Sequence, residues 1–134
     1  MTPVGHVFTM YAAHQNRQSL RSEFSAPSVH YDRDGKPASF WALRGSASLH
    51  DKQLVVTAVN TNIKDALETQ IVVRGSPVSS GEATVLTASD IHARNTFEQR
   101  QAVTPKTQRL EVKGDTLTFR VPAASVIKLD LRLA

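Results

Sequence analysis

The sequence predicts a mainly β protein, an antiparallel β-sandwich preceded by one N-terminal α-helix. Near the N-terminus apolar residues recur at helical spacing, whereas from residue 40 onward short β-rich segments alternate with turn signals. The length of 134 residues is that of one domain. A chain of this size can bury a single core without disulfides or metals to support it.

The N-terminal segment carries both start signals and one apolar face of a helix. Thr2 is a good N-cap, and Pro3 suits the first helical turn because its missing N–H has no partner there. The apolar residues at helical spacing are Val4, Val7, Phe8, Tyr11 and Ala12. We expect a helix over residues 3–15 that packs against the sandwich or a neighbouring molecule, with Val7, Phe8 and Tyr11 as its interface residues.

Residues 17–39 show no helical periodicity and few of the residues that favour strands. The segment 32–37 (Asp-Arg-Asp-Gly-Lys-Pro) is a turn signal, and the surrounding stretch is polar. We therefore expect an extended, partly ordered crossing between the helix and the sandwich. The boundary between the two parts is expected within residues 16–25.

About seven strands are expected after this segment. Residues 54–60 are apolar on both faces, which is typical of a central strand, and the last strand alternates apolar with charged side chains. The expected strands span residues 42–49, 54–60, 67–73, 83–88, 109–113, 116–121 and 127–133, with a Gly114-Asp115 turn between two of them. Several short strands separated by turns favour an antiparallel sandwich.

Composition argues against several classes of protein. The net charge of +4 comes from dispersed Lys and Arg residues with few aromatic neighbours, so a nucleic-acid partner is not predicted. No apolar run approaches membrane-spanning length, so no membrane partner is predicted. The N-terminus lacks signal-peptide features and the chain has no cysteine, so the compartment, cytoplasmic or secreted, stays open.

No cofactor or metal site is predicted. The spacing of His6 and His14, eight residues apart, does not fit a shared metal ion, and a surface or helix-end role is favoured. The pattern Asp32-x-Asp34-Gly35 resembles the start of a calcium loop, but Lys36 and Pro37 follow it where further oxygen ligands are needed. A turn whose carboxylates bond their own backbone is the better interpretation.

No catalytic residue is predicted either. Glycoside hydrolysis requires two carboxylates that face each other across a pocket. The acidic residues here lie mostly in turns or at outward strand positions, and no nucleophile motif or phosphate loop is present.

Two aromatic features leave alternatives open. Trp41, with Phe40 and Tyr31, is a candidate sugar-stacking platform, although a single Trp beside a strand start is more often core or interface. Phe97 lies in a long polar connection spanning residues 89–107. We expect it to anchor that loop on the sandwich or on a neighbour, in preference to a binding role.

Four segments together resemble one known family. Residues 3–15 (Pro-Val-Gly-His-Val-Phe-Thr-Met-Tyr-Ala-Ala-His-Gln) look like the last barrel helix of α-L-arabinofuranosidases of glycoside hydrolase family 51. Three other pieces agree in order: residues 46–60; residues 85–105 with their Asn-Thr-Phe-Glu; and residues 121–126. The sequence departs from the family at residues 99–102, where the family often has a proline-containing turn.

The resemblance implies a C-terminal sandwich taken from a larger enzyme. Such enzymes join a catalytic (β/α)₈ barrel to a jelly-roll sandwich. They release terminal arabinofuranosyl groups from arabinan and arabinoxylan, with retention, through two barrel glutamates. No position of this chain matches those glutamates, so no catalytic residue is carried over.

We therefore expect two parts, residues 1–16 as a helix resembling the last barrel helix and residues 17–134 as the sandwich. The chain would be inactive alone and structural in role, with the catalytic barrel of the parent enzyme as its partner. Arabinose-containing polysaccharide would be reached only through the parent, and an unpaired sheet edge would favour a homo-oligomer. The alternatives are a non-catalytic carbohydrate-binding module and a stand-alone interaction domain.

Overall fold

The computed structural model describes residues 2–23, 28–110, 112 and 116–134. One helix and ten strands follow in order: α1 (Pro3–Tyr11), β1 (Gln18–Leu20), β2 (Ser28–Arg33), β3 (Lys36–Trp41), β4 (Leu43–His50), β5 (Gln53–Asn60), β6 (Leu67–Val72), β7 (Val78–Leu86), β8 (Lys106–Leu110), β9 (Thr116–Val121) and β10 (Ser125–Leu133). A short 3₁₀ turn, η1 (Ala12–His14), continues α1. Within the described ranges no helix is long and apolar enough to cross a membrane.

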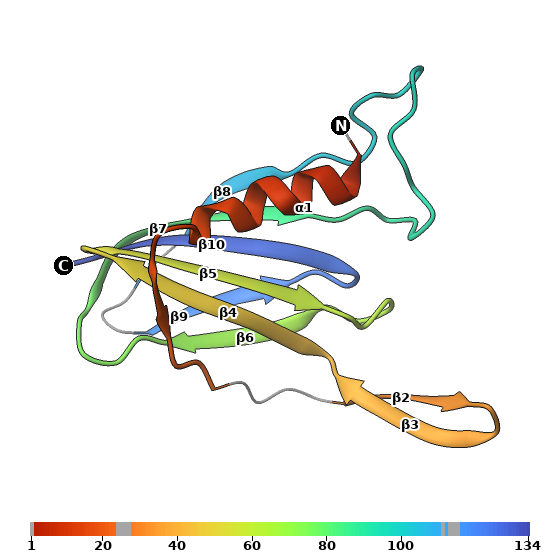
Figure 1. Ribbon diagram of the computed structural model, residues 1–134, viewed down its shortest axis with the longest axis horizontal. Coiled ribbons are helices and arrows are strands. Elements are labelled where there is room, and N and C mark those ends of the chain that lie inside the picture. The colour runs from red at the N-terminus through yellow and green to blue at the C-terminus, as the bar shows by residue number, and fades with distance from the viewer. Residues whose placement is uncertain (1, 24–27, 111, 113–115) are drawn as a thin grey trace.

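The strands form a two-layered antiparallel sandwich. A six-stranded sheet has the order β1-β4-β5-β10-β7-β8, and β6 pairs with β9 in a small second sheet. Figure 1 shows α1 lying along one face of the large sheet, with β6 and β9 on the other. The expected fold class, a β-sandwich after one helix, is confirmed.

The core lies between the two sheets. In β10 the residues at alternate positions, Ile127, Leu129 and Leu131, are almost completely buried. They pack with Leu117, Phe119 and Val121 of β9 and with partners from β5 and β7. The period-two pattern that predicted this strand therefore places one complete row of side chains in the core.

One buried polar side chain fixes the end of β5. The amide of Asn60, which is 1% exposed, donates to the backbone carbonyls of Asp65, Val121 and Pro122 at 3.0–3.3 Å. Its oxygen accepts from the backbone N–H of Asn62. Asn60 thus ties β5 to the β9–β10 turn, because a buried amide must satisfy its donors and acceptor.

The helix begins and ends as the sequence signals indicate. The Thr2 side chain accepts from the backbone N–H of Gly5 at 3.0 Å, as an N-cap does. The α-helix proper ends at Tyr11, and η1 extends it to His14, close to the predicted end at residue 15. Asn16 then adopts a left-handed φ of 58°, which turns the chain toward β1.

The prediction for residues 17–39 was wrong, because this segment contains three strands. Short β1 pairs with β4, and β2 and β3 form a hairpin that projects from the sandwich (Figure 1). Asp34 and Gly35 both have positive φ, as a tight two-residue hairpin turn requires. This hairpin is a separate two-stranded sheet outside the six-stranded sheet and the β6–β9 pair.

Two further strand boundaries differ from the prediction. Strand β7 covers residues 78–86 where 83–88 was expected, and β8 covers residues 106–110 where 109–113 was expected. The Gly114-Asp115 turn lies outside the described residues.

Candidate functional site

Helix α1 packs on the sheet through a narrower face than the sequence suggested. Met10 is buried against Leu86 of β7 and Val103, and half-buried Val7 and Tyr11 pack around this cluster. These helical positions share one side because they are three and four residues apart. Met10 was not predicted, although it lies on the same side as Val7.

Phe8 does not pack on the sandwich, because its side chain is 75% exposed. The other expectation for Phe8, a contact with a neighbouring molecule, stays a prediction. It follows Val7 by one position, which turns it about 100° away from the contact face. Val4, one turn earlier, shares its side and is also exposed. The helix therefore has a second apolar face that the chain leaves uncovered.

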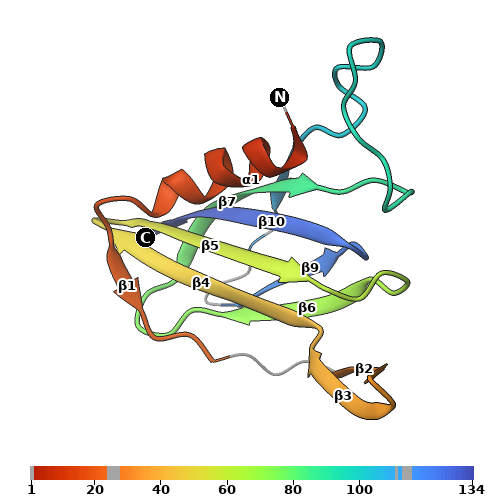
Figure 2. The ribbon, with the colours of Figure 1, turned by 45° about the vertical axis from the view of Figure 1, so that its right-hand side comes forward.

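Two loops add exposed apolar side chains near the same end of the molecule. The β7–β8 loop carries Ile91 and Phe97, and the β5–β6 loop carries Ile63. Both ribbon views place the β7–β8 loop beside the N-terminal end of α1 (Figures 1 and 2). We call Val4, Phe8, Ile63, Ile91 and Phe97 the apolar surface. Among the described residues, the other large apolar side chain with comparable exposure is Val72 on β6.

Phe97 is 90% exposed, so it does not anchor its loop on the sandwich as one of the two expectations had it. Asn95 fixes the loop instead: its amide donates to the carbonyl of Val103 at 2.8 Å, and its oxygen accepts from the Val103 N–H at 2.7 Å. The other expectation, an anchor on a neighbouring molecule, stays a prediction.

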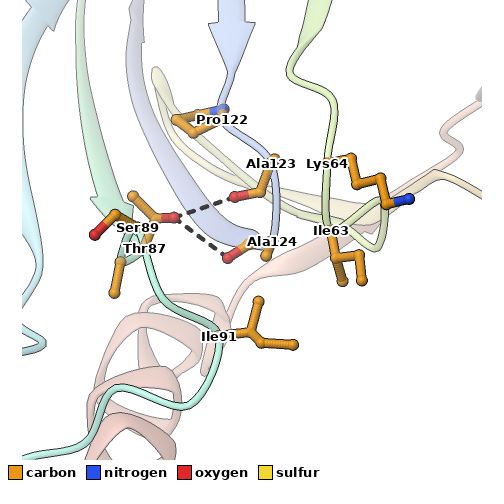
Figure 3. Close-up of a pocket in the computed structure, with 9 residues that line it drawn as sticks. Ile63, Lys64, Thr87, Ser89, Ile91, Pro122, Ala123 and Ala124 are labelled. Carbon is orange, nitrogen blue, oxygen red and sulfur yellow. Dashed lines mark hydrogen bonds between the residues drawn. The ribbon is translucent and has the colours of Figure 1, made fainter.

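An open pocket of about 340 Å³ lies between the two loops. Ile63 and Lys64 come from one loop and Thr87, Ser89 and Ile91 from the other. The β9–β10 turn at residues 122–124 lies between them (Figure 3). The Thr87 hydroxyl donates to the carbonyls of Ala123 and Ala124 at 3.1 and 3.3 Å. Lys64 is the only ionisable side chain in the lining, so the lining holds no pair of acid–base groups.

His14 joins the helical segment to the large sheet through polar contacts. Its Nδ1 lies 2.5 Å from the Ser48 hydroxyl and its Nε2 2.8 Å from the Thr57 hydroxyl. Burial lowers the pKa of His14 below its ordinary value of 6.5, and the Arg17 guanidinium lowers this pKa further. His14 is the last residue of η1, as the expected helix-end role requires. The structure adds that it is a half-buried link between η1, β4 and β5.

The acidic residues that the structure describes do not form a glycosidase pair. Among the residues whose burial the structure describes, every Asp and Glu is exposed apart from Asp130, which is half-buried. Asp130 forms an ion pair with Lys128 on the helix-covered face of β10, with 3.4 Å between Oδ2 and Nζ. Groups of His, Cys, Asp and Glu that could hold a metal ion are also absent from the described part of the chain.

The candidate sugar platform lies on the projecting hairpin. Tyr31 belongs to β2 and Trp41 to β3, where Trp41 pairs with Ser28 and Tyr31 with Ala38. The side chains of Tyr31, Phe40 and Trp41 lie outside the described part of the structure. Their role in stacking therefore stays a prediction.

Comparison with known proteins gives consistent matches over almost the whole chain. The family "Alpha-L-arabinofuranosidase C-terminal domain" matches residues 1–125. The "Intracellular exo-alpha-L-arabinofuranosidase" of Bacteroides ovatus is 24% identical over 133 residues, which make up 98% of this chain and 26% of that protein.

Solved structures agree in fold. The family 51 arabinofuranosidase of Xanthomonas axonopodis pv. citri superimposes with a TM-score of 0.86 at 29% identity, over 98% of this chain and 26% of its own. The α-L-arabinofuranosidase of Thermotoga maritima superimposes with a TM-score of 0.85 at 22% identity, over 99% of this chain and 29% of its own. The chain thus spans about a quarter of the length of these relatives. It belongs to the α-L-arabinofuranosidase C-terminal domain family.

Proposed function

We propose that this chain is the accessory β-sandwich of a longer arabinofuranosidase-type glycoside hydrolase. The parent would release terminal arabinofuranosyl groups from arabinan or arabinoxylan. Residues 1–16 would form the last helix of its catalytic barrel and residues 17–134 the sandwich beside it. The observation that carries this proposal is the second, exposed apolar face of α1 in a chain that matches only a quarter of its relatives.

The two faces of α1 suit a helix shared by two domains. Met10, Val7 and Tyr11 bind it to the sandwich, while Phe8 and Val4 offer an apolar stripe outward. Helices of a (β/α)₈ barrel bury one side against the barrel strands. The exposed Val4 and Phe8 support such a contact. The helix would then pack on the sandwich with one side and on the barrel with the other.

The acidic residues support a catalytic role for the barrel and a structural role for this chain. A retaining glycosidase needs two carboxyl groups about 5 Å apart. The described Asp and Glu side chains are exposed, or paired with Lys128 in the case of Asp130. The reaction would therefore belong to the parent, and this chain would cover the barrel flank.

The exposed helix face also bears on the alternatives. A stand-alone interaction domain would have to bury the apolar face of its helix within its own chain, and Phe8 is not buried. A carbohydrate-binding module through Trp41 and Tyr31 stays a prediction, and so does a homo-oligomer.

The test compares the chain alone with a hybrid enzyme. In the hybrid this chain replaces the matching quarter of the Xanthomonas relative. We expect the chain alone to show no turnover of 4-nitrophenyl α-L-arabinofuranoside and the hybrid to be active. In the hybrid, Phe8→Asp should reduce the free energy of unfolding by about 2 kcal/mol or more, because it buries an unpaired charge.

Val72→Asp is the matched control, since Val72 is an exposed apolar residue on β6 in the second sheet. It should change the stability of the hybrid by less than about 0.5 kcal/mol. Equal effects of the two substitutions would contradict docking through α1. A dimer of the isolated chain that Phe8→Asp dissolves, without any effect in the hybrid, would assign the surface to a second copy.

A further inference from the structure

The β7–β8 loop extends beyond the N-terminal end of α1. In both ribbon views it leaves the large sheet on the side that carries the helix and rises past the start of the chain (Figures 1 and 2). Ala93 and Val103 at its base pack on the cluster around Met10. The position of the loop relative to the helix is therefore fixed by apolar contacts.

The tip of this loop, residues 95–102, is held in shape by its own hydrogen bonds. Asn95 closes it through both backbone groups of Val103. The Gln99 N–H donates to the Thr96 hydroxyl at 3.0 Å, and the Thr96 N–H donates to the Gln99 carbonyl at 3.1 Å. An internally bonded turn thus presents Phe97 to solvent.

The tip combines one large apolar ring with polar neighbours. Phe97 is 90% exposed, and all of the side chains that follow it are exposed: Glu98, Gln99, Arg100 and Gln101. Burying these polar groups in a protein interface would require a partner for each of them. A neutral sugar polymer fits the set better, since an aromatic face packs on sugar C–H groups while amide, carboxylate and guanidinium groups bond hydroxyls.

The direction of α1 indicates which part of the parent this tip approaches. Active sites of (β/α)₈ barrels lie at the carboxyl ends of the strands, and each helix begins at that face because it follows its strand. If α1 is the last barrel helix, its N-terminal end at Pro3 lies at the catalytic face. The loop that extends past this end then stands at the rim of the active site.

We propose that residues 95–102 form a substrate-binding rim of the parent enzyme, with Phe97 in contact with sugar rings of the polysaccharide beyond the bond that is cleaved. This inference rests on the proposed function, which supplies the barrel. The contact adds affinity for polymer and leaves the bond-breaking step to the barrel. A small substrate that fills only the cleavage position does not reach the tip.

The test uses the hybrid enzyme with two substrates, arabinoxylan and 4-nitrophenyl α-L-arabinofuranoside. Phe97→Ala should raise KM for arabinoxylan about two- to tenfold, the range that loss of one aromatic contact gives. The kcat/KM for the chromogenic substrate should stay unchanged. Phe97→Trp should keep the wild-type KM for arabinoxylan, because it retains an aromatic face.

Phe8→Ala is the control for a purely structural role, since Phe8 lies on the helix. It should lower the melting temperature of the hybrid without a preferential effect on arabinoxylan. An unchanged KM for arabinoxylan in Phe97→Ala would overturn the inference. So would an equal loss on both substrates with a lowered melting temperature, which would make Phe97 a domain anchor. A folded hybrid that turns over neither substrate would refute the proposed function itself.

Discussion

The two faces of the six-stranded sheet are covered in different ways. The inner face meets β6 and β9, and Ile127, Leu129 and Leu131 on it are at most 2% exposed. The outer face carries α1 over a smaller apolar cluster around Met10, together with the polar contacts of His14. The inner face is buried by strands of this chain. The outer face is covered by α1, and the side of α1 that carries Val4 and Phe8 is itself exposed. We therefore assign stability to the inner face and, in the proposed parent enzyme, docking to the outer face.

The largest effect is expected on the inner face. Leu129→Ala should lower the free energy of unfolding by about 2–5 kcal/mol, because it opens a cavity in the packed core. Urea denaturation of the isolated chain measures this change. Val72→Ala, at an exposed position of the same domain, should stay within about 0.5 kcal/mol. A loss below about 1 kcal/mol for Leu129→Ala would show that the inner face is loosely packed.

The outer face should respond less, and in a way that separates the two sides of α1. Met10→Ala should cost about 2 kcal/mol, at the low end for a buried methionine because its cluster is small. Phe8→Ala should change the stability of the isolated chain by less than about 0.5 kcal/mol, since its ring is exposed. The same denaturation measurement compares the two. Equal losses would mean that both sides of the helix are packed within this chain.

The smallest effect is a pH dependence of the outer face. The pKa of His14 is lowered in the folded chain, so the unfolded chain binds the proton first as pH falls. The stabilisation from neutral His14 is complete above the unfolded pKa near 6.5. It is lost as pH falls through that value and levels off below the lowered pKa.

Urea denaturation between about pH 8 and pH 5 measures this slope. Wild type should lose more stability over this range than His14→Gln, while His92→Gln, at an exposed position, should keep the wild-type slope. Parallel profiles for wild type and His14→Gln would show that His14 titrates alike in both states.

The parts of the fold that the sequence predicted are those that bury a periodic face. Strands β9 and β10 alternate strictly and were placed within two residues of their observed ends. The segments β1, β2 and β3 were missed because they are short or lie outside the two layers, where pairing does not require apolar alternation. Tertiary pairing decided their conformation.

The candidate site was less accessible to prediction, because it depends on rotation and on distant partners. Exposed Phe8 is one residue from half-buried Val7 and two residues from buried Met10, and the apolar pattern of α1 is too broad to tell these positions apart. His14 meets Ser48 and Thr57 across 34 and 43 residues of chain, which no local pattern encodes. The family resemblance identified the 85–105 segment, but the exposure of Phe97 required the structure.

The pair of hydrogen bonds between Asn95 and Val103 has a consequence for substitutions in the tip. Because one side chain holds both backbone groups of Val103, the two ends of the tip are joined independently of what lies between them. Residues 96–102 lie between these two closing residues, and none of them belongs to the cluster at Met10. In the proposed parent enzyme, substitutions within residues 96–102 would then change the polymer contact and leave the Asn95–Val103 closure in place.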